Sequence, residues 1–162
     1  MDMRIVRKHP SDCSKAELDA FEGLVKEGGE VNTQGLSERI LRAEWLVFLL
    51  EGNGKYAGIA ALKRPNDSYK KKVFAKAGTS CKPGDFLFEA GWLFVAPAYR
   101  GKRHSRLLLD TVIELAGTER VYATTRESNE FMRRTNRRCG LVDTGSPYKS
   151  EDGDYKLVLS VR

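Results

Sequence analysis

The spacing of apolar residues along the chain changes repeatedly between a pattern typical of strands and one typical of helices. Runs of branched and aromatic residues predict strands at 3–7, 45–51, 56–62, 86–95, 120–125, 141–142 and 155–161. Apolar residues three and four positions apart predict helices at about 14–28, 36–44, 107–116 and 128–138, with a short basic helix at 68–77. This mixture of elements indicates an α/β fold with a mixed sheet.

Turn signals support parts of this arrangement. Ser14 stands three residues before Glu17 and forms a capping box, which predicts that a helix begins there. The segment 52–55 contains Asn53 and Gly54, which tolerate the positive φ angles of a tight turn, so it predicts an antiparallel hairpin. Residues 63–85 are harder to interpret, because a segment of this length either borders a binding site or forms a solvated surface excursion.

The chain is organised around the stretch from Phe86 to about Gly117. It reads as a strand that ends at Pro97, a basic turn, and an apolar helix. The first N–H groups of a helix have no internal partner and carry partial positive charge, so this turn is suited to bind an anion. From the turn alone, a phosphate cradle and an ordinary charged loop are equally good interpretations.

Length and composition are those of one globular domain covering residues 1–162. Apolar residues make up 41% of the chain and charged residues 31%, and no stretch resembles a signal peptide or a membrane span. Cys13, Cys81 and Cys139 are odd in number and far apart, and there are two histidines, so no zinc motif is present. We expect a cytoplasmic protein with no metal and no membrane partner.

The net charge of +6 is unevenly distributed along the chain, with two strongly basic regions. Residues 99–140 contain ten Lys and Arg against five Asp and Glu, and residues 63–76 contain six against one. Such a distribution favours an anionic ligand, which includes a nucleotide cofactor, nucleic acid and an acidic substrate.

Two segments carry a resemblance to a known family. Residues 95–102 read Val-Ala-Pro-Ala-Tyr-Arg-Gly-Lys at the end of the central strand, and residues 121–125 are followed by Ser128-Asn129 and by Cys139-Gly140-Leu141. Together they resemble the GNAT superfamily of acyl-CoA-dependent N-acyltransferases. The resemblance implies a GNAT-like mixed, largely antiparallel sheet with flanking helices, in which the central parallel strands 86–95 and 120–125 splay apart. It also implies acetyl-CoA as acyl donor.

The same resemblance implies where the cofactor binds. Pantetheine would bond to the backbone near Leu93 and Val95, and Asn129 either caps its helix or contacts the cofactor. The pyrophosphate would meet the turn and its N–H groups, formed by Arg100, Gly101, Lys102, Arg103, His104 and Ser105.

The turn departs from the family pattern at its two small positions, which hold Arg103 and Ser105. A side chain at the glycine position is expected to hinder close approach of phosphate, since only glycine lacks a Cβ. Lys102 and Arg103 offer charge-assisted contacts that would compensate, so we expect binding to be retained.

One carboxyl group and one hydroxyl group are the candidates for the predicted acid–base chemistry. Glu89 is the only charged residue between Phe86 and Val95, which makes it the candidate base; the alternative is a glutamate paired with Lys or Arg in the core. The family's acidic Tyr is replaced here by Asn136, which cannot donate a proton. Tyr148 is the candidate acid, and Tyr99, Tyr122 and water are the alternatives.

The run 133–138 places Arg133 beside Arg137 and Arg134 beside Arg138 on a helix. Three interpretations remain: a solvated face, a contact with the cofactor's phosphate end, and a contact with nucleic acid.

The sequence thus predicts an N-acetyltransferase that moves acetyl by direct attack to a primary amine of a small molecule, peptide or protein, as monomer or homodimer. The alternatives are an enzyme that acts on an amine attached to nucleic acid, and a catalytically weak module that binds acyl-CoA or nucleic acid.

Overall fold

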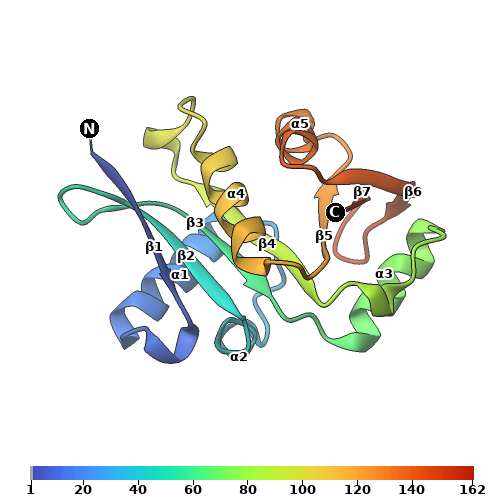
Figure 1. Ribbon diagram of the computed structural model, residues 1–162, viewed down its shortest axis with the longest axis horizontal. Helices are drawn as coiled ribbons and strands as arrows, with labels where there is room; N and C mark the ends of the chain where they lie inside the picture. Colours follow the sequence, from blue (N-terminus) through green and yellow to red (C-terminus); the bar gives the residue numbers. More distant parts are fainter. Residues whose placement is uncertain (1) are drawn as a thin grey trace. The chain divides into compact units, whose positions relative to one another are not determined.

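The computed structural model describes residues 2–162, which form two compact units (Figure 1). One unit contains the chain up to Lys63 together with residues 90–115, and the other contains residues 64–89 and 116–162. Strand β4 (Phe88–Val95) begins in the second unit and continues in the first. Within residues 2–162, the helices are all too short or too polar to cross a membrane.

The first unit carries strands in the order β1-β2-β3-β4. β1 (Met3–Lys8), β2 (Trp45–Glu51) and β3 (Tyr56–Lys63) pair in antiparallel fashion, and the predicted hairpin joins β2 to β3. Its helices are α1 (Lys15–Gly28), α2 (Leu36–Leu41) and α4 (His104–Ala116). Short 3-10 turns lie at Pro10–Asp12 and Pro97–Tyr99.

Helices α1 and α2 cover one face of this part of the sheet (Figure 1). Phe21 of α1 is fully buried and its ring meets the rings of Phe48 and Trp92 edge-on at centroid distances of 5.6 and 6.0 Å. Ile40 of α2 joins the same apolar cluster. The helices are therefore held by the apolar stripes that their sequences show.

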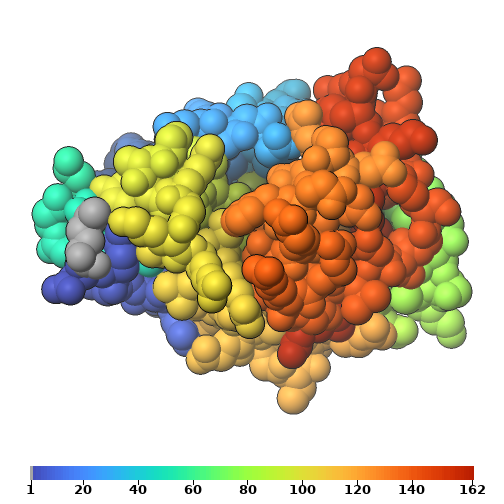
Figure 2. Space-filling view, turned by 90° about the horizontal axis from the view of Figure 1, so that it is seen from above, coloured from blue at the N-terminus to red at the C-terminus, as the bar shows by residue number. Residues whose placement is uncertain are grey.

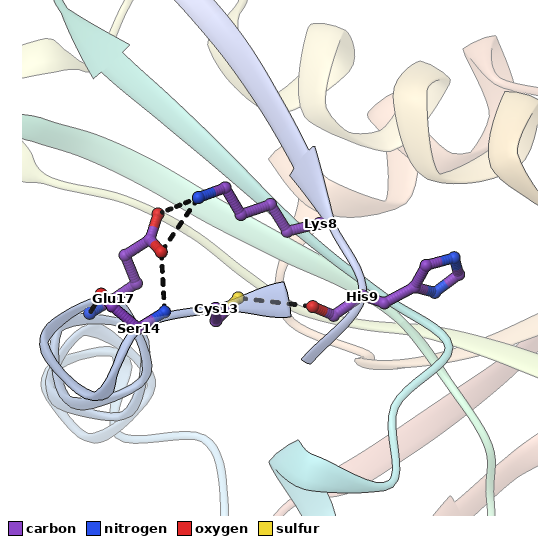
Figure 3. A network of polar contacts seen from close by, with 5 residues as sticks. All are labelled: Lys8, His9, Cys13, Ser14 and Glu17. Carbon is purple, nitrogen blue, oxygen red and sulfur yellow. Dashed lines mark hydrogen bonds and ion pairs between the residues drawn. The ribbon is translucent and has the colours of Figure 1, made fainter. Parts of the chain in front are cut away.

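The start of α1 confirms the predicted capping box (Figure 3). The Glu17 N–H donates to the Ser14 hydroxyl at 3.1 Å, and the Ser14 N–H donates to the Glu17 carboxylate at 2.8 Å. Lys8 of β1 donates to the same carboxylate at 2.8 Å, which lowers the pKa of Glu17 and raises that of Lys8. The first strand and first helix are thereby joined at this corner.

The second unit carries strands in the order β4-β5-β7-β6. β5 (Val121–Arg126) runs parallel to β4, with Phe88 opposite Val121 and Glu89 opposite Tyr122. β7 (Lys156–Val161) pairs antiparallel with β5 and with β6 (Val142–Lys149). The fold is the predicted α/β type, with a largely antiparallel sheet that contains one parallel pair.

Helix α3 (Asp67–Ala77) confirms the predicted basic helix, preceded by the N-cap Asn66 and followed by left-handed Gly78. In Figure 1 it lies, in green, beside β6 and β7. The buried Lys70 donates to the Phe86 carbonyl at 2.7 Å, and the Phe74 ring lies 5.3 Å from the rings of both Phe86 and Tyr122. The lysine run is thus partly structural.

Several predicted boundaries were wrong. The strand predicted at 141–142 extends to Lys149, because β6 is an edge strand that tolerates Pro147 at a register shift between Thr144 and Tyr148. Helix α2 ends at Leu41, where Arg42 already serves as C-cap. Helix α5 (Glu130–Arg138) begins at Glu130 and not at Ser128, and the predicted capping by Asn129 is confirmed, since the Asn129 side chain accepts from the Met132 N–H at 3.0 Å.

Candidate active site

Strand β4 is kinked at Trp92, whose φ of 51° lies in the left-handed region. A bulky residue with positive φ interrupts the alternation of a strand. Leu93 and Phe94, although consecutive, are both half-buried. The Trp92 ring packs into the core of the first unit with the Lys63 ammonium 4.4 Å from its centroid. The backbone near Leu93 therefore departs from a regular ladder at the place where a pantetheine contact is predicted.

The turn between β4 and α4 contains two left-handed residues, Gly101 with φ 84° and Arg103 with φ 62°. Arg103 thus adopts the conformation that a glycine would supply at the same position. Residues of alternating handedness turn successive N–H groups toward one side and form a concavity suited to anions. A Cβ placed on Gly101 would have no atom within 4 Å, so the backbone is open at this point.

The N–H groups of this turn are available to a ligand. The Leu107 N–H makes the first helical bond, to the Arg103 carbonyl at 3.2 Å. Within residues 2–162, the N–H groups of residues 101–106 donate to no other group. The His104 Nε2 is buried and likewise has no partner there. Lys102 and Arg103 are exposed. These features fit a pyrophosphate, which needs several donors and positive charge.

Arg100 folds back onto the strand that precedes it. Its Nε donates to the Val95 carbonyl at 2.9 Å, and its guanidinium lies 5.6 Å from the centre of the Phe94 ring. Arg100 therefore braces the end of β4, and Lys102 and Arg103 are the basic side chains of the turn that point to solvent.

Glu89 lies in the second unit among tyrosines. It is only 4% exposed, and the fully buried Tyr122 directs its hydroxyl to Glu89 Oε1 at 3.4 Å, a long hydrogen bond. Helix α3 contributes Tyr69, which shares a side-chain hydrogen bond with Thr124 and is 44% exposed overall. Tyr148 of β6 belongs to the same apolar cluster as Tyr122.

The surroundings of the three tyrosines raise the pKa values of their hydroxyl groups. Burial and the negative charge of Glu89 raise the pKa of Tyr122 well above its usual value, and the same two causes raise the pKa of Tyr148. For Tyr69, the charge of Glu89 is the larger cause of a raised pKa and burial is the second. All three groups are protonated at neutral pH and can donate.

Tyr148 and Asn136 hold unused polar atoms. The Tyr148 hydroxyl is buried and has no hydrogen-bond partner within residues 2–162. Asn136 donates to the Thr125 hydroxyl at 2.9 Å, whereas its Oδ1 is buried without a partner in the same range. Such atoms cost free energy unless a ligand or water satisfies them.

Tyr122 and Thr125 lie on opposite faces of β5, so α3 and α5 cover different sides of the strand.

The comparison with known families decides the identity. The sequence model of the Acetyltransferase (GNAT) family matches residues 15–141. The chain belongs to the GNAT acetyltransferase family. This family uses acetyl-CoA as its acyl donor. No curated relative matches the sequence.

Solved structures of GNAT proteins share the fold along nearly the whole chain. An acyl-CoA N-acyltransferase from Pseudomonas aeruginosa has a TM-score of 0.72 at 15% identity, with 99% of each chain covered. NAA60 of Arabidopsis thaliana, crystallised with acetyl-CoA, has a TM-score of 0.69 at 13% identity and covers 99% of this chain and 98% of its own. The yncA protein of Salmonella typhimurium, also with acetyl-CoA, has a TM-score of 0.64 at 19% identity. The match covers 100% of this chain and 94% of the yncA chain.

The predicted site residues of this chain fall into two groups, one in each compact unit. Leu93, Val95 and the turn 100–105 lie in the first unit, whereas Glu89, Tyr148 and Asn129 lie in the second. Asn129 caps α5, and its contact with cofactor remains a prediction, as do the roles of Glu89 and Tyr148. Tyr99, an alternative acid, donates instead to the Glu51 carboxylate at 2.5 Å.

Sequence reasoning missed Tyr69. In the helix predicted at 68–77, the ring of Tyr69 counts as an apolar position, which leaves out its hydroxyl. The signal available was its position in a segment inserted just before the central strand, where a side chain can reach the residues that begin that strand.

Proposed function

We propose that this protein is an N-acetyltransferase that moves acetyl from acetyl-CoA to a primary amine of a small molecule, peptide or protein by direct attack. The observation that carries the proposal is the turn after β4, which keeps left-handed residues at Gly101 and Arg103 and leaves the N–H groups of 101–106 available. Membership in the GNAT family and the neighbours crystallised with acetyl-CoA support the same donor.

The turn would hold the pyrophosphate. The N–H groups of residues 101–105 would donate to its oxygens, and Lys102 and Arg103 would add charge-assisted contacts. The backbone near Leu93 and Val95 would bond to pantetheine, beside the kink at Trp92. When bound, acetyl-CoA supplies an activated acetyl thioester. In the described part of the chain, 2–162, Phe88 and Glu89 are the residues of β4 that pair with β5, which is compatible with strands that separate beyond them.

Glu89 would act as the base. An amine must lose a proton before or during its attack on a thioester, and the buried carboxylate of Glu89 would accept it, directly or through water. The tyrosine hydroxyls near Glu89 are neutral donors, so they would orient this carboxylate by hydrogen bonding without adding a second charge beside it.

Tyr148 would act as the acid in place of the family's Tyr, which is Asn136 here. Its raised pKa keeps the proton on the hydroxyl at neutral pH, and its hydroxyl has no partner within residues 2–162. It would deliver this proton to the leaving sulfur. Asn136 would instead accept a hydrogen bond through its unused Oδ1.

The proposal also includes one domain located in the cytoplasm. The family match at 15–141 takes in segments of both units, which supports a single domain. Cys13, Cys81 and Cys139 are all free thiols, which fits a reducing compartment.

The test is release of free thiol from acetyl-CoA in the presence of pooled primary amines. Glu89→Gln is expected to lower kcat by about 10²-fold or more and Tyr148→Phe by a smaller factor, because positioned acid–base groups contribute on that order. Exposed Glu119→Gln is the matched control and should leave kcat unchanged. Binding of acetyl-CoA without turnover would favour the binding module, and unchanged kcat in Glu89→Gln would remove Glu89 as base.

A further inference from the structure

Helix α5 presents arginines on its solvent side. Its inner side carries Thr135 and Asn136, which are 5% and 1% exposed. The outer side, called the arginine face below, consists of Phe131, Arg134, Arg137 and Arg138, all of them exposed. In Figure 2 this helix, in orange, faces the viewer.

The carboxylates near α5 pair with Arg133, which is not part of the arginine face. Arg133 pairs with Asp143 at 3.0 Å and with Glu130 at 3.6 Å, and it also donates to the Glu127 carbonyl at 3.0 Å. By contrast, the side chains of Arg134, Arg137 and Arg138 form no ion pair or hydrogen bond within the part of the chain from residue 2 to 162. Their charges are therefore not balanced by neighbouring carboxylates.

A further arginine extends this charge beyond the helix. Gly140, with φ 88°, ends α5, and a Cβ built on it would lie 2.9 Å from the Nε of Arg162. The Arg162 side chain therefore lies against the residue that ends α5. It adds positive charge at the end of a helix whose last turn holds Arg137 and Arg138, and an anionic partner would relieve the repulsion among these like charges.

The aromatic ring on the same face indicates the kind of anion. Phe131 is 56% exposed and lies one turn before Arg134 and two turns before Arg138, so the three side chains share one side of the helix. A carboxylate-rich peptide would use the arginines and leave the ring in water. Single-stranded nucleic acid uses both, because phosphates contact arginines and bases stack on aromatic faces.

We propose that the arginine face binds single-stranded nucleic acid, with Arg134, Arg137, Arg138 and Arg162 on phosphates and Phe131 stacked on a base. This surface does not depend on the proposed acetyl transfer. Arg137 and Arg138 lie in the last turn of α5, where positive charge stabilises the helix dipole, so their presence has this second explanation. The helix dipole does not explain why Arg134 is basic or why Phe131 is exposed.

The experiment measures fluorescence anisotropy of a labelled single-stranded RNA of about 12 nucleotides across a salt series. The variant Arg134→Ala/Arg138→Ala should lower the slope of log Kd against log salt by about 1.4, since each single-strand phosphate contact contributes about 0.7. Phe131→Ala should weaken binding about fivefold or more, and Phe131→Tyr should retain it because the stacking surface is kept.

The matched control is Arg4→Ala/Arg42→Ala, which removes the same charge from exposed arginines of the first unit. It should leave the slope unchanged. Equal losses in the control and in Arg134→Ala/Arg138→Ala would overturn the proposal, because net charge alone would then explain binding. Tighter binding of hexaglutamate than of RNA would also overturn it. So would complete displacement of RNA by coenzyme A together with weaker coenzyme A binding in Arg134→Ala/Arg138→Ala, which would assign the face to the cofactor.

Discussion

Arg103 shows how one residue can keep a backbone shape that its family builds with glycine. The sequence indicates a steric conflict at this position, since a side chain stands where glycine is usual. In the structure Arg103 takes a φ of 62°, so the turn keeps its form and the arginine bears local strain. Sequence reasoning locates the position, but the φ angle follows from the whole turn and could not be predicted.

Arg103→Gly and Arg103→Ala separate this strain from the loss of charge. Both variants remove the guanidinium, but only alanine must hold a Cβ in the left-handed region, which costs about 1 kcal/mol. The free energy of unfolding, measured by urea denaturation, should be higher for Arg103→Gly than for Arg103→Ala by about that amount. Equal stability, or a more stable alanine variant, would show that the turn is not left-handed in solution.

Tyr122 gives a second prediction at this scale, through the pH dependence of stability. Because its pKa is raised, the folded protein keeps the Tyr122 proton above pH 10 while the unfolded chain loses it. The unfolded state then binds fewer protons, so the free energy of unfolding falls as the pH rises. Tyr122→Phe should reduce this fall by about 1 kcal/mol between about pH 10 and 11, as measured by urea unfolding. An unchanged slope would contradict burial of the Tyr122 hydroxyl.

Among the elements, α3 differs most from what the sequence alone could define. Its apolar positions predict the helix, and Gly78 predicts its end. The lysine run, however, looks uniformly solvated until the packing is known: Lys70 is 8% exposed and holds the Phe86 carbonyl, whereas the side chain of Lys71 is 66% exposed. Most of strand β6 was missed for a related reason, since Pro147 suits a strand only at an edge.

Lys70→Met tests the structural role of α3. Methionine keeps the apolar stem but leaves the Phe86 carbonyl without its donor, so the free energy of unfolding should fall by about 1–2 kcal/mol. Lys71→Met, which removes an exposed pair with Asp67, should change it by less than about 0.5 kcal/mol. Equal effects of the two substitutions in urea unfolding would mean that Lys70 does not anchor the helix.

At the scale of the whole molecule, the order of the elements and the segment 95–102 were sufficient to predict the fold and the family. The individual roles of charged and hydroxyl side chains were not, because they depend on which partners lie nearby. Arg133 and Arg134 are neighbours in sequence, yet one is paired with Asp143 and Glu130 and the other has no ion pair within residues 2–162. Tyr99, an alternative to Tyr148 as the acid, donates to Glu51, a partner that its position in the sequence does not indicate.

The turn after β4 is proposed to bind the pyrophosphate of acetyl-CoA, and isothermal titration tests this directly. Wild type should bind acetyl-CoA at least about tenfold more tightly than acetylpantetheine, which lacks the pyrophosphate, because charge-assisted hydrogen bonds contribute about 1.5–3 kcal/mol. Lys102→Glu should remove most of that difference, whereas Arg42→Glu, an equal charge change away from the turn, should not. Equal affinity of wild type for both compounds, or no binding of either at millimolar concentration, would contradict the account.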